Sequence, residues 1–318
     1  MAFNLKAFDE AGTPMPDLYP QENQAGLDFG SNSRPPHPMD LVRMGATVVA
    51  SLSGGKDGQA MLAHLVDRIG VPKDQIIAIH ADLGDAEWPG TASHAKSQAD
   101  HYGVPFLVCR AKDMAGNPKD LLDYVDQRGQ FFSRSARFCT SDWKRGPIRR
   151  TVNAYLKTIG HPSPYVLNAM GMRAEESVER KKMKPLQFRK DASCPAVSYP
   201  EILDAETRAH KRIFFDWHPI LHFSEKQVFA TIKAAGQEPH WAYTEAGARR
   251  LSCLICMFSS EEDIRAAVSS SDKGKAYARR IIDIEERHDH TILPLRSAGK
   301  GKPKEKRWIR DIVGDLIA

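Results

Sequence analysis

The sequence predicts an α/β protein built on a doubly wound, mostly parallel β-sheet. Apolar stretches alternate with stretches of helical periodicity between residues 46 and 236, and this order places parallel strands between covering helices. The first stretch, residues 46–52, is continuously apolar, as strands of buried parallel sheets are. Hydrophobic residues make up 42% of the chain and charged residues 27%, which are ordinary values for a globular protein.

Strand and helix patterns follow one another along the chain. The apolar runs predict five strands, which lie at residues 46–52, 75–84, 104–109, 165–171 and 212–221. Helical periodicity predicts helices at residues 57–70, 91–102, 121–128, 147–160, 225–236 and 273–289, and a further helix that begins at Glu261.

Capping patterns locate the first turns of three helices. Pro147 suits a first helical turn, where its missing N–H group is no loss. Ser224 with Gln227, and Ser259 with Glu262, each fit the reciprocal capping box of serine and an acidic or amide residue three positions later.

The chain divides into three predicted parts. Residues 1–36 are rich in Pro, Gly and Asn and indicate an irregular arm, residues 37–236 form the α/β domain, and residues 237–318 form a helical region rich in Cys and Arg. No secretory signal or membrane span is recognisable, and five cysteines are an odd number, so we expect reduced thiols in a cytoplasmic protein. The net charge of +5 favours anionic partners only weakly.

The junction after the first strand predicts a phosphate-binding loop. Glycines let the backbone approach a ligand, and the helix that follows directs unpaired N–H groups at the same point. A lysine adds a full positive charge. The junction consists of Ser53, Gly54, Gly55, Lys56, Asp57 and Gly58. The Walker pattern does not fit, because Ala50 stands at its first glycine and Asp57 follows the lysine, and the dinucleotide pattern fails as well.

This junction resembles the PP-loop of the ATP-pyrophosphatase family, whose motif is S-G-G-K-D-S. Gly58 departs from the motif, because the family's last serine offers a hydroxyl group to a phosphate oxygen. The resemblance implies that residues 53–58, called the PP-loop below, bind the phosphates of ATP or a related adenylyl nucleotide. A backbone N–H group or a water molecule would then replace the serine.

Four further stretches resemble the phosphoadenylylsulfate (PAPS) reductase-like branch of these proteins, over residues 46–260. "IHADLGDAEWPGT" is similar to its second-strand motif, which implies that His80, Asp82 and Gly84 hold the nucleotide. "RFCTSDWKRGPIRR" resembles the element C-T-x-x-x-K-x-x-P, and "GMRAEESVER" resembles G-x-R-x-E-E-S-x-x-R. "DWHPILHFSEKQVF" is similar to the segment that precedes a helix in the same branch.

Cations of these motifs complete the predicted site. Arg173 and Arg180 follow a parallel strand at the carboxyl edge where such sheets bind ligands, and guanidinium groups suit phosphate and sulfate oxygens. Lys144 adds a cation from another loop, although each charge taken alone could be a solvated surface residue. We predict Lys56, Asp57, Lys144 and Arg173 as catalytic residues and Arg180 as a nucleotide ligand.

Acidic residues near this edge have two interpretations. Glu175 and Glu176 could hold Mg²⁺ or pair with the arginines, and pairing is favoured. Asp57 and Asp82 are the other Mg²⁺ candidates, although Mg²⁺ often relies on substrate phosphates and few carboxylates.

Cysteines predict a metal centre. The candidate ligands are Cys139, Cys194, Cys253 and Cys256. The last two form a C-x-x-C pair suited to one metal, and we expect Arg249 and Arg250 to lower the pKa values of their thiols. Thiolates select iron–sulfur clusters or zinc. A resemblance to cluster-bearing sulfur-transfer members of the branch, among them proteins of DNA phosphorothioation and phage-encoded relatives, favours [4Fe–4S] over zinc. Redox-active or plain core cysteines are the alternatives, and Cys109 is expected to be a buried small hydrophobe.

Two basic stretches, residues 180–190 and 300–310, have an open interpretation. Each contains an aromatic residue, Phe188 or Trp308, that could stack on a base while the cations follow a nucleic-acid backbone. A solvated loop and a solvated tail are the alternative.

Three functions fit these observations. The leading one is an enzyme that cleaves ATP between the α and β phosphates and adenylylates an acceptor for sulfur transfer. The resemblance implies DNA or RNA as acceptor and a cysteine desulfurase or another protein as sulfur donor. The second is reduction of PAPS or APS to sulfite, although no cysteine follows Cys256 to serve the thioredoxin-linked mechanism. The third is a non-catalytic module that binds nucleotide or nucleic acid, which Gly58 supports.

Overall fold

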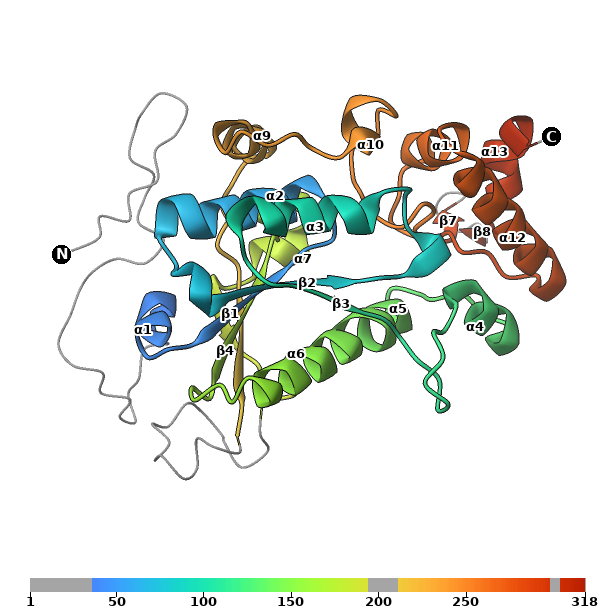
Figure 1. Cartoon of the computed structure of the whole chain (residues 1–318). Helices are drawn as coiled ribbons and strands as arrows, with labels where there is room; N and C mark the ends of the chain where they lie inside the picture. Colours follow the sequence, from blue (N-terminus) through green and yellow to red (C-terminus); the bar gives the residue numbers. More distant parts are fainter. Residues whose placement is uncertain (1–35, 194–210, 298–303, 318) are drawn as a thin grey trace.

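The main sheet has the strand order of a doubly wound α/β protein (Figure 1). The computed structural model describes residues 36–193, 211–297 and 304–317. Six strands follow the order β3-β2-β1-β4-β6-β5. They are β1 (Thr47–Ser51), β2 (Ile76–Ala81), β3 (Phe106–Cys109), β4 (Tyr165–Met170), β5 (Leu186–Phe188) and β6 (Ile213–Trp217). Neighbouring strands are parallel, except that β5 is antiparallel to β6. The predicted fold class is confirmed.

Helices cover both faces of this sheet, with α2, α3 and α9 above it and α6 below it in Figure 1. Helices up to β5 are α1 (Pro38–Arg43), α2 (Lys56–Ala63), η1 (His64–Ile69), η2 (Lys73–Gln75), η3 (Gly84–Ala86), α3 (Thr91–Tyr102), α4 (Leu121–Arg128), α5 (Phe138–Thr140), η4 (Ser141–Arg145), α6 (Gly146–Thr158), η5 (Ala174–Glu176) and α7 (Val178–Lys181). After β6 come α9 (Glu225–Ala234), α10 (Trp241–Thr244), α11 (Glu261–Ser269), α12 (Asp272–His288), the hairpin strands β7 (Arg296–Ser297) and β8 (Lys304–Glu305), and α13 (Ile309–Ile317). No helix in these described ranges is both long and apolar enough to cross a membrane.

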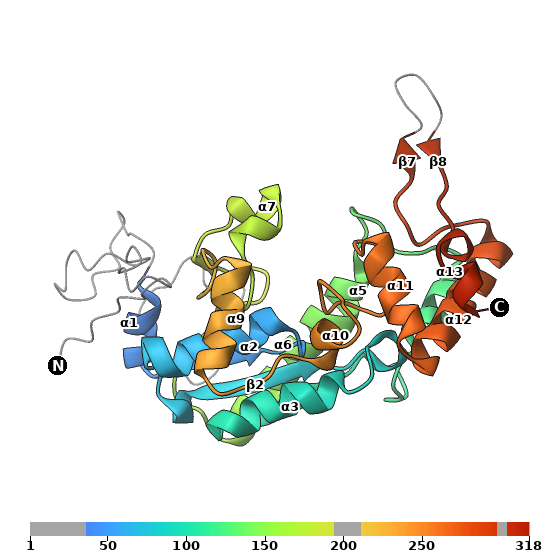
Figure 2. The ribbon, with the colours of Figure 1, turned by 90° about the horizontal axis from the view of Figure 1, so that it is seen from above.

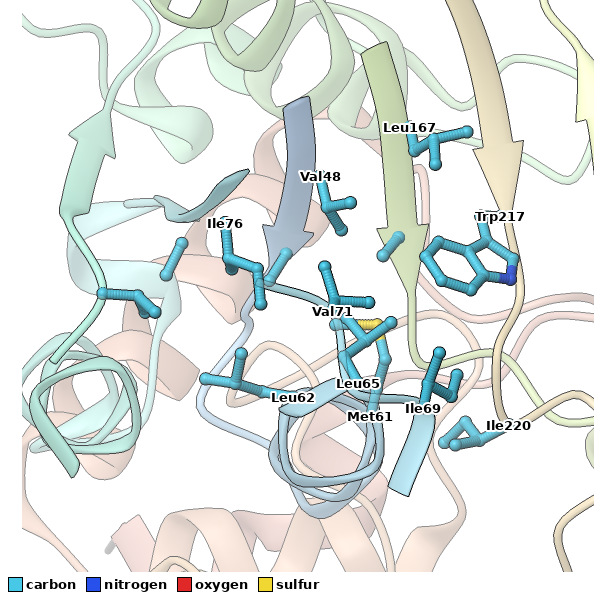
Figure 3. Packing of buried hydrophobic residues seen from close by; sticks show 14 of the residues in the cluster. Val48, Met61, Leu62, Leu65, Ile69, Val71, Ile76, Leu167, Trp217 and Ile220 are labelled. Atoms are coloured by element: carbon cyan, nitrogen blue, oxygen red, sulfur yellow. The ribbon is translucent and has the colours of Figure 1, made fainter. Parts of the chain in front are cut away.

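The largest core on the sheet lies between the central strands and α2, η1, α3 and α9. Val48 and Leu167 of the strands lie together with Met61 and Leu65 of the helix, as Figure 3 shows, and all four are fully buried. The helix forms where predicted because its apolar residues recur at spacings of three and four. η1 continues α2 and ends before Gly70, whose φ of 75° suits glycine.

A smaller core covers the opposite face of the sheet, where α6 packs. Val152 and Leu156 of this helix join Val49 and Val166 of the strands. Val48 and Val49 are neighbours on β1 and are buried on opposite faces. The strand therefore has no exposed side, which explains its unbroken apolar sequence.

A second large core lies beyond the carboxyl ends of β2 and β3. It joins α11, α12 and α13 to α4 and to loop residues such as Leu83 and Trp88. In Figures 1 and 2 the C-terminal helices accordingly lie together at one end of the molecule. The residues of this core come from both sides of residue 236. The domain boundary predicted there stays a prediction, and the predicted arm lies outside the described residues apart from residue 36.

Several described elements are absent from the prediction, among them β5 and α13. The three residues of β5 lie inside a basic stretch, so neither length nor apolar pattern marks them. The tail that was left open as a solvated segment ends in α13, whose Ile309, Ile312 and Val313 are buried in the second core.

One of the two predicted capping boxes is found. The Ser224 side chain accepts a hydrogen bond from the Gln227 N–H group, and the Gln227 side chain accepts one from the Ser224 N–H group. The box at Ser259 is wrong, because α11 is capped by Ser260, which accepts from the N–H group of Asp263. Two consecutive serines are followed by several acidic residues, so the sequence pattern fits a cap at either serine.

Candidate functional site

The PP-loop lies where the winding of the sheet changes direction. β1 pairs with β2 on one side and β4 on the other, and the chain continues outward from both. In doubly wound sheets, ligands bind in the crevice beyond the carboxyl ends of the two strands at this point. The loop after β1 and residues 171–173 after β4 meet there, which places the PP-loop and Arg173 at the predicted edge.

Two glycines allow the close backbone approaches around the PP-loop, one toward α3 and one between the loops after β1 and β4. Gly54 has a φ of 74°, and a Cβ atom there would lie 2.9 Å from the carbonyl oxygen of Thr91. A Cβ atom at Gly171 would lie 2.5 Å from the carbonyl carbon and oxygen of Asp57. Any side chain at residue 171 would therefore push the end of β4 away from the first turn of α2.

Lys56 is buried in the PP-loop, with 2% of its surface exposed. Its Nζ atom lies 3.3 Å from Glu225 Oε1 and 3.4 Å from Asp57 Oδ2, and it donates to the carbonyl oxygen of Arg249 at 3.3 Å. The ring of Tyr243 lies 5.1 Å away. A buried ammonium group needs such partners, because an unpaired charge is costly in the interior. The charge is thus held beside the loop by oxygens from three segments.

The hydroxyl group of Tyr243 lies against the backbone of the same loop. It accepts hydrogen bonds from the N–H groups of Lys56 and Leu251, at 3.2 and 3.1 Å. Burial raises the pKa of Tyr243 to about 12, so the hydroxyl stays neutral. The N–H groups of a first helical turn have no partner within the helix and are the donors that bind phosphate. One such donor is already bonded to a side-chain oxygen.

Arg173 connects the two loops through ion pairs. Its Nε atom donates to Asp57 Oδ1 at 2.6 Å, and its Nη1 atom lies 2.9 Å from Glu175 Oε1. Only 4% of the arginine is exposed. Burial opposes its charge, but Asp57 and Glu175 outweigh burial and raise the pKa of Arg173. The predicted residues Asp57 and Arg173 are therefore brought together.

Glu176 holds two further cations of the site. It forms an ion pair with Arg180, and its Oε1 atom lies 3.3 Å from Arg250 Nη2. Burial and then the nearby Arg250 lower the pKa of Arg180. The favoured interpretation of the glutamates is confirmed, since both pair with arginines rather than standing free.

The end of the second strand is linked to the PP-loop through His80. Its ring nitrogens lie 2.9 Å from the carbonyl oxygen of Leu52 and 3.1 Å from Glu87 Oε2. Burial opposes protonation, but Glu87 and the Leu52 carbonyl raise the pKa of His80. The histidine is fully buried and its two ring nitrogens are occupied by these partners. Its predicted nucleotide contact stays a prediction.

Asp82 and Gly84 form a turn at the same strand end. The N–H group of Gly84 donates to Asp82 Oδ1 at 2.7 Å, and Arg110 Nη1 lies 3.5 Å from Asp82 Oδ2. Gly84 has a φ of 62°, a conformation that favours glycine. Both residues are partly exposed at the edge where the nucleotide is expected.

The space around Gly58 accommodates a Cβ atom. A Cβ atom there would lie 3.6 Å from both Leu52 Cδ2 and the carbonyl oxygen of Ser51, which are ordinary contacts. Steric exclusion therefore does not explain the departure from the PP-loop motif, and nothing in the structure does.

Three predicted cysteines lie near Lys144 and near one another. The thiols of Cys139, Cys253 and Cys256 influence each other's pKa values, and Lys144 acts on all three. Burial lowers the pKa of Lys144, but these thiols, with Glu87, raise it more. The backbone of Cys253 forms an antiparallel bridge with Glu87, which fixes the C-x-x-C loop beside the second strand.

The pKa values of these thiols are raised by burial, contrary to the prediction. We predicted that Arg249 and Arg250 lower the thiol pKa values. Burial instead raises the pKa of Cys253 to about 11 and also raises those of Cys139 and Cys256. Lys144 opposes this effect at all three thiols, and Arg250 adds a smaller contribution at Cys256. The prediction was wrong because both arginine side chains are exposed and burial outweighs them.

The thiols suit a soft metal in donor type but not in placement. Within the described ranges, no group of three or more His, Cys, Asp or Glu side chains is placed to hold a metal ion. Cys194 lies outside those ranges, so its predicted role stays a prediction. Cys109 is buried at the end of β3, as expected, and burial raises its pKa to about 11.

The two aromatic residues of the basic stretches differ in setting. Phe188 packs on Phe215 with ring centroids 5.7 Å apart and adjoins the sheet core. Lys306 lies over the Trp308 ring, 5.2 Å from its centroid, and the ring is partly exposed. A core setting thus favours the structural interpretation for Phe188 over base stacking.

The sequence analysis missed three residues of the site: Tyr243, Glu225 and Glu87. Tyr243 lies 187 positions from the N–H group that it accepts from, so no local pattern links the two. The aromatic density near residue 241 was the only available signal. Glu225 looked like an ordinary first-turn acidic residue of α9.

The comparison with known families now decides the assignment. The sequence model of the phosphoadenosine phosphosulfate reductase domain matches residues 47–258, about two thirds of the chain. The chain belongs to this family. The matched residues 47–258 include the PP-loop, the Arg173 loop and the C-x-x-C pair of this chain.

Solved structures give weaker similarities. A phosphoadenylyl-sulfate reductase from Candida auris, in a phosphate complex, is 14% identical with a TM-score of 0.40, and the match covers 68% of this chain and 87% of that one. A U34-tRNA thiolase from Methanococcus maripaludis, with its [4Fe–4S] cluster, is 15% identical with a TM-score of 0.37, covering 87% and 86%. An FMN adenylyltransferase from Candida glabrata, with FAD and inorganic pyrophosphate, is 12% identical with a TM-score of 0.36, covering 66% and 57%. Scores at this level carry no argument about function. No curated protein sequence matches the chain.

Proposed function

We propose that this member of the reductase-domain family is an enzyme that binds ATP or a related adenylyl nucleotide and adenylylates an acceptor for sulfur transfer. One observation carries the proposal. The PP-loop, with buried Lys56, and the Arg173 loop converge at the switch point of the sheet. An acceptor oxygen would attack the α phosphorus, the bond between this phosphorus and the α–β bridging oxygen would break, and pyrophosphate would leave.

The residues have separate roles in this proposal. Lys56 and the loop N–H groups stabilise charge that develops on the leaving pyrophosphate. Arg173 holds Asp57 at 2.6 Å and so fixes the first turn of α2 against the loop after β4. Lys144 lies beside the thiols rather than the PP-loop contacts, so we assign it to the sulfur-bearing side of the site.

Mg²⁺ would accompany the nucleotide. Asp57 and Asp82 are partly exposed carboxylates at the edge where the phosphates are expected, which fits the oxygen ligands that Mg²⁺ prefers. Each already has an arginine nearby, Arg173 or Arg110, so nucleotide phosphates must supply most of the ligands. Mg²⁺ would supply further neutralisation of phosphate charge.

A [4Fe–4S] centre, preferred to zinc, remains a hypothesis for Cys139, Cys253, Cys256 and Cys194, and no step above passes through it. Iron analysis of anaerobically purified protein tests it, with about four iron atoms per chain and brown absorbance expected. Cys253→Ser should lose the iron, whereas the matched variant Cys109→Ser should keep it. Colourless protein that contains zinc would remove the hypothesis.

Pyrophosphate release decides the proposed reaction. The full chain is incubated with ATP, Mg²⁺ and candidate acceptors, and pyrophosphate is measured. Lys56→Met should reduce the rate at least tenfold, whereas Lys96→Met, at an exposed helix position paired with Asp100, should not. Equal rates for the wild type and Lys56→Met would sink the proposal.

Reduction of PAPS or APS to sulfite is the second candidate, because the matching family model describes that domain. Sulfite release from PAPS, with no pyrophosphate from ATP, would identify this reaction. The third candidate, a non-catalytic module, would show tight nucleotide binding with neither product.

A further inference from the structure

A pocket outside the nucleotide site opens beside the C-x-x-C loop. Its volume is about 530 Å³, within the range of ligand-binding pockets. Its walls include Arg134, Phe258, Glu261, Leu295, Arg296 and Arg307. None of these residues belongs to the PP-loop or to the ion pairs around it.

The pocket is formed by the same loops that carry the cysteines. Phe258 follows Cys256 by two positions, and the N–H group of Ser259 donates to the carbonyl oxygen of Cys256 at 2.9 Å. Arg134 lies in the segment between α4 and α5, and α5 contains Cys139. The pocket is therefore lined by residues that closely follow Cys256 in the chain and by one that precedes Cys139 by five positions.

Positive charge dominates the walls. Arg134 and Arg296 are exposed and form no ion pair within the described part of the chain. Arg307 has one partner, Glu261, whose Oε1 atom lies 2.5 Å from its Nη2 atom. Three guanidinium groups thus face one carboxylate, and a polyanion would relieve their repulsion.

Apolar surface lies between these cations. Phe258 is 46% exposed and Leu295 is 51% exposed, although both types of side chain are usually buried. Met257 and Leu293 are buried beneath them as part of the second core. An exposed aromatic ring among arginines is the arrangement on which the bases of a single strand stack while phosphates bind the cations.

Arginines connect this pocket with the nucleotide site. Arg137 lies three positions after Arg134, and its charge acts on Arg180. Arg250 and Arg173 act on Arg180 as well.

We propose that this pocket binds a single-stranded nucleic acid as the acceptor of the proposed reaction, with a base on Phe258 and phosphates on Arg134 and Arg296. The inference rests on the proposed function for the role of the strand, but not for its binding. An acidic peptide would match the charge, yet it has no use for the exposed ring between the cations.

Binding is tested on the full chain with labelled oligonucleotides of about ten nucleotides, as single-stranded DNA and single-stranded RNA of one sequence. Arg134→Gln/Arg296→Gln should weaken binding at least tenfold and flatten the plot of log affinity against log salt by about 0.7 for each arginine. Phe258→Ala should weaken binding at least fivefold. Arg43→Gln is the matched control, because Arg43 is exposed on α1 and is not a pocket residue, and it should bind the oligonucleotide normally.

Glu261→Gln provides a test in the opposite direction. It frees Arg307 and should tighten binding several-fold, an effect that misfolding would not produce. Whichever of the DNA and RNA arms binds more tightly identifies the source of the strand. Unchanged binding by the arginine and Phe258 variants would overturn the inference. Equal affinity for poly-glutamate of the same length, lost in the same variants, would also overturn it.

The nucleotide assay separates this inference from the proposed function. Lys56→Met should bind the oligonucleotide normally. If ATP is never cleaved but oligonucleotide binding is weakened by the pocket variants, the proposed reaction is wrong and the nucleic-acid site is supported. If pyrophosphate is released but the pocket variants bind the oligonucleotide normally, only the inference about the nucleic-acid site is wrong.

Discussion

The hydroxyl group of Tyr243 accepts a hydrogen bond from the backbone N–H group of Lys56 at 3.2 Å, where the PP-loop enters α2. It occupies a donor that a phosphate oxygen would use. Tyr243→Phe should therefore bind ATP several-fold more tightly while losing about 1 kcal/mol of stability. Calorimetric titration and urea unfolding measure the two effects.

Tyr155→Phe, on α6 and away from the PP-loop, is the control for the loss of a tyrosine hydroxyl. Weaker ATP binding by Tyr243→Phe would show the contrary, that the hydroxyl donates to the nucleotide.

Gly58→Ser should restore the family's phosphate contact, because a Cβ atom fits beside Leu52 at 3.6 Å. One additional hydrogen bond is worth roughly 1 kcal/mol, so nucleotide affinity should rise about fivefold. Gly58→Ala is the matched control, since it fills the same space and gains up to about 1 kcal/mol of helix propensity without a hydroxyl. If serine and alanine affect affinity equally, the missing hydroxyl has no part in binding.

Breaking the ion pair between the partly exposed Asp57 and the buried Arg173 should be strongly destabilising. Asp57→Asn leaves Arg173 with Glu175 as its remaining carboxylate, and we expect a loss of about 3 kcal/mol in the free energy of unfolding. Asp40→Asn removes the exposed pair with Arg43 and should cost less than about 1 kcal/mol.

A double-mutant cycle then tests the coupling of this pair. Asp57→Asn/Arg173→Gln should cost less than the sum of the single variants. Additive losses in urea unfolding would contradict the coupling inferred from the 2.6 Å contact.

Two buried histidines should make the fold sensitive to acid. Burial, with Arg68, lowers the pKa of His64 to about 4, and burial, with His94, lowers the pKa of His240 to about 4. The unfolded chain takes up these protons near its ordinary pKa of about 6.5. Stability is therefore fully present above about pH 6.5 and is lost as pH falls toward 4, by up to about 3 kcal/mol for each histidine.

Urea unfolding at about pH 7 and about pH 5 measures this loss. His64→Gln should flatten the dependence, whereas His222→Gln, at an exposed position, should leave it unchanged. An equal slope in the wild type and His64→Gln would rule out this histidine as a source.

Much of the sheet was predictable because its signals are local. The helix predicted at residues 91–102 is α3, which the structure bounds at Thr91 and Tyr102, since glycines flank it on both sides. β5 was not predictable, because its three residues pair with β6 only through the tertiary fold.

In the candidate site too, features with a local sequence signal were predicted and features that depend on the tertiary fold were not. A short motif marks the PP-loop, so Lys56 and Asp57 were found. The Tyr243 contact depends on packing between segments far apart in sequence, which no spacing reveals. The thiol pKa values were misjudged because sequence shows the neighbouring arginines but not the burial that outweighs them.

The second large core is shared by residues on both sides of residue 236, so neither part of the chain should fold without the other. A chain cut after residue 236 would keep Leu83, Trp88 and Leu122 but lose the helices that shield them from water. Such a fragment would expose an apolar surface near the carboxyl ends of β2 and β3 and should aggregate. The two parts of the chain on either side of residue 236 should therefore unfold in one transition.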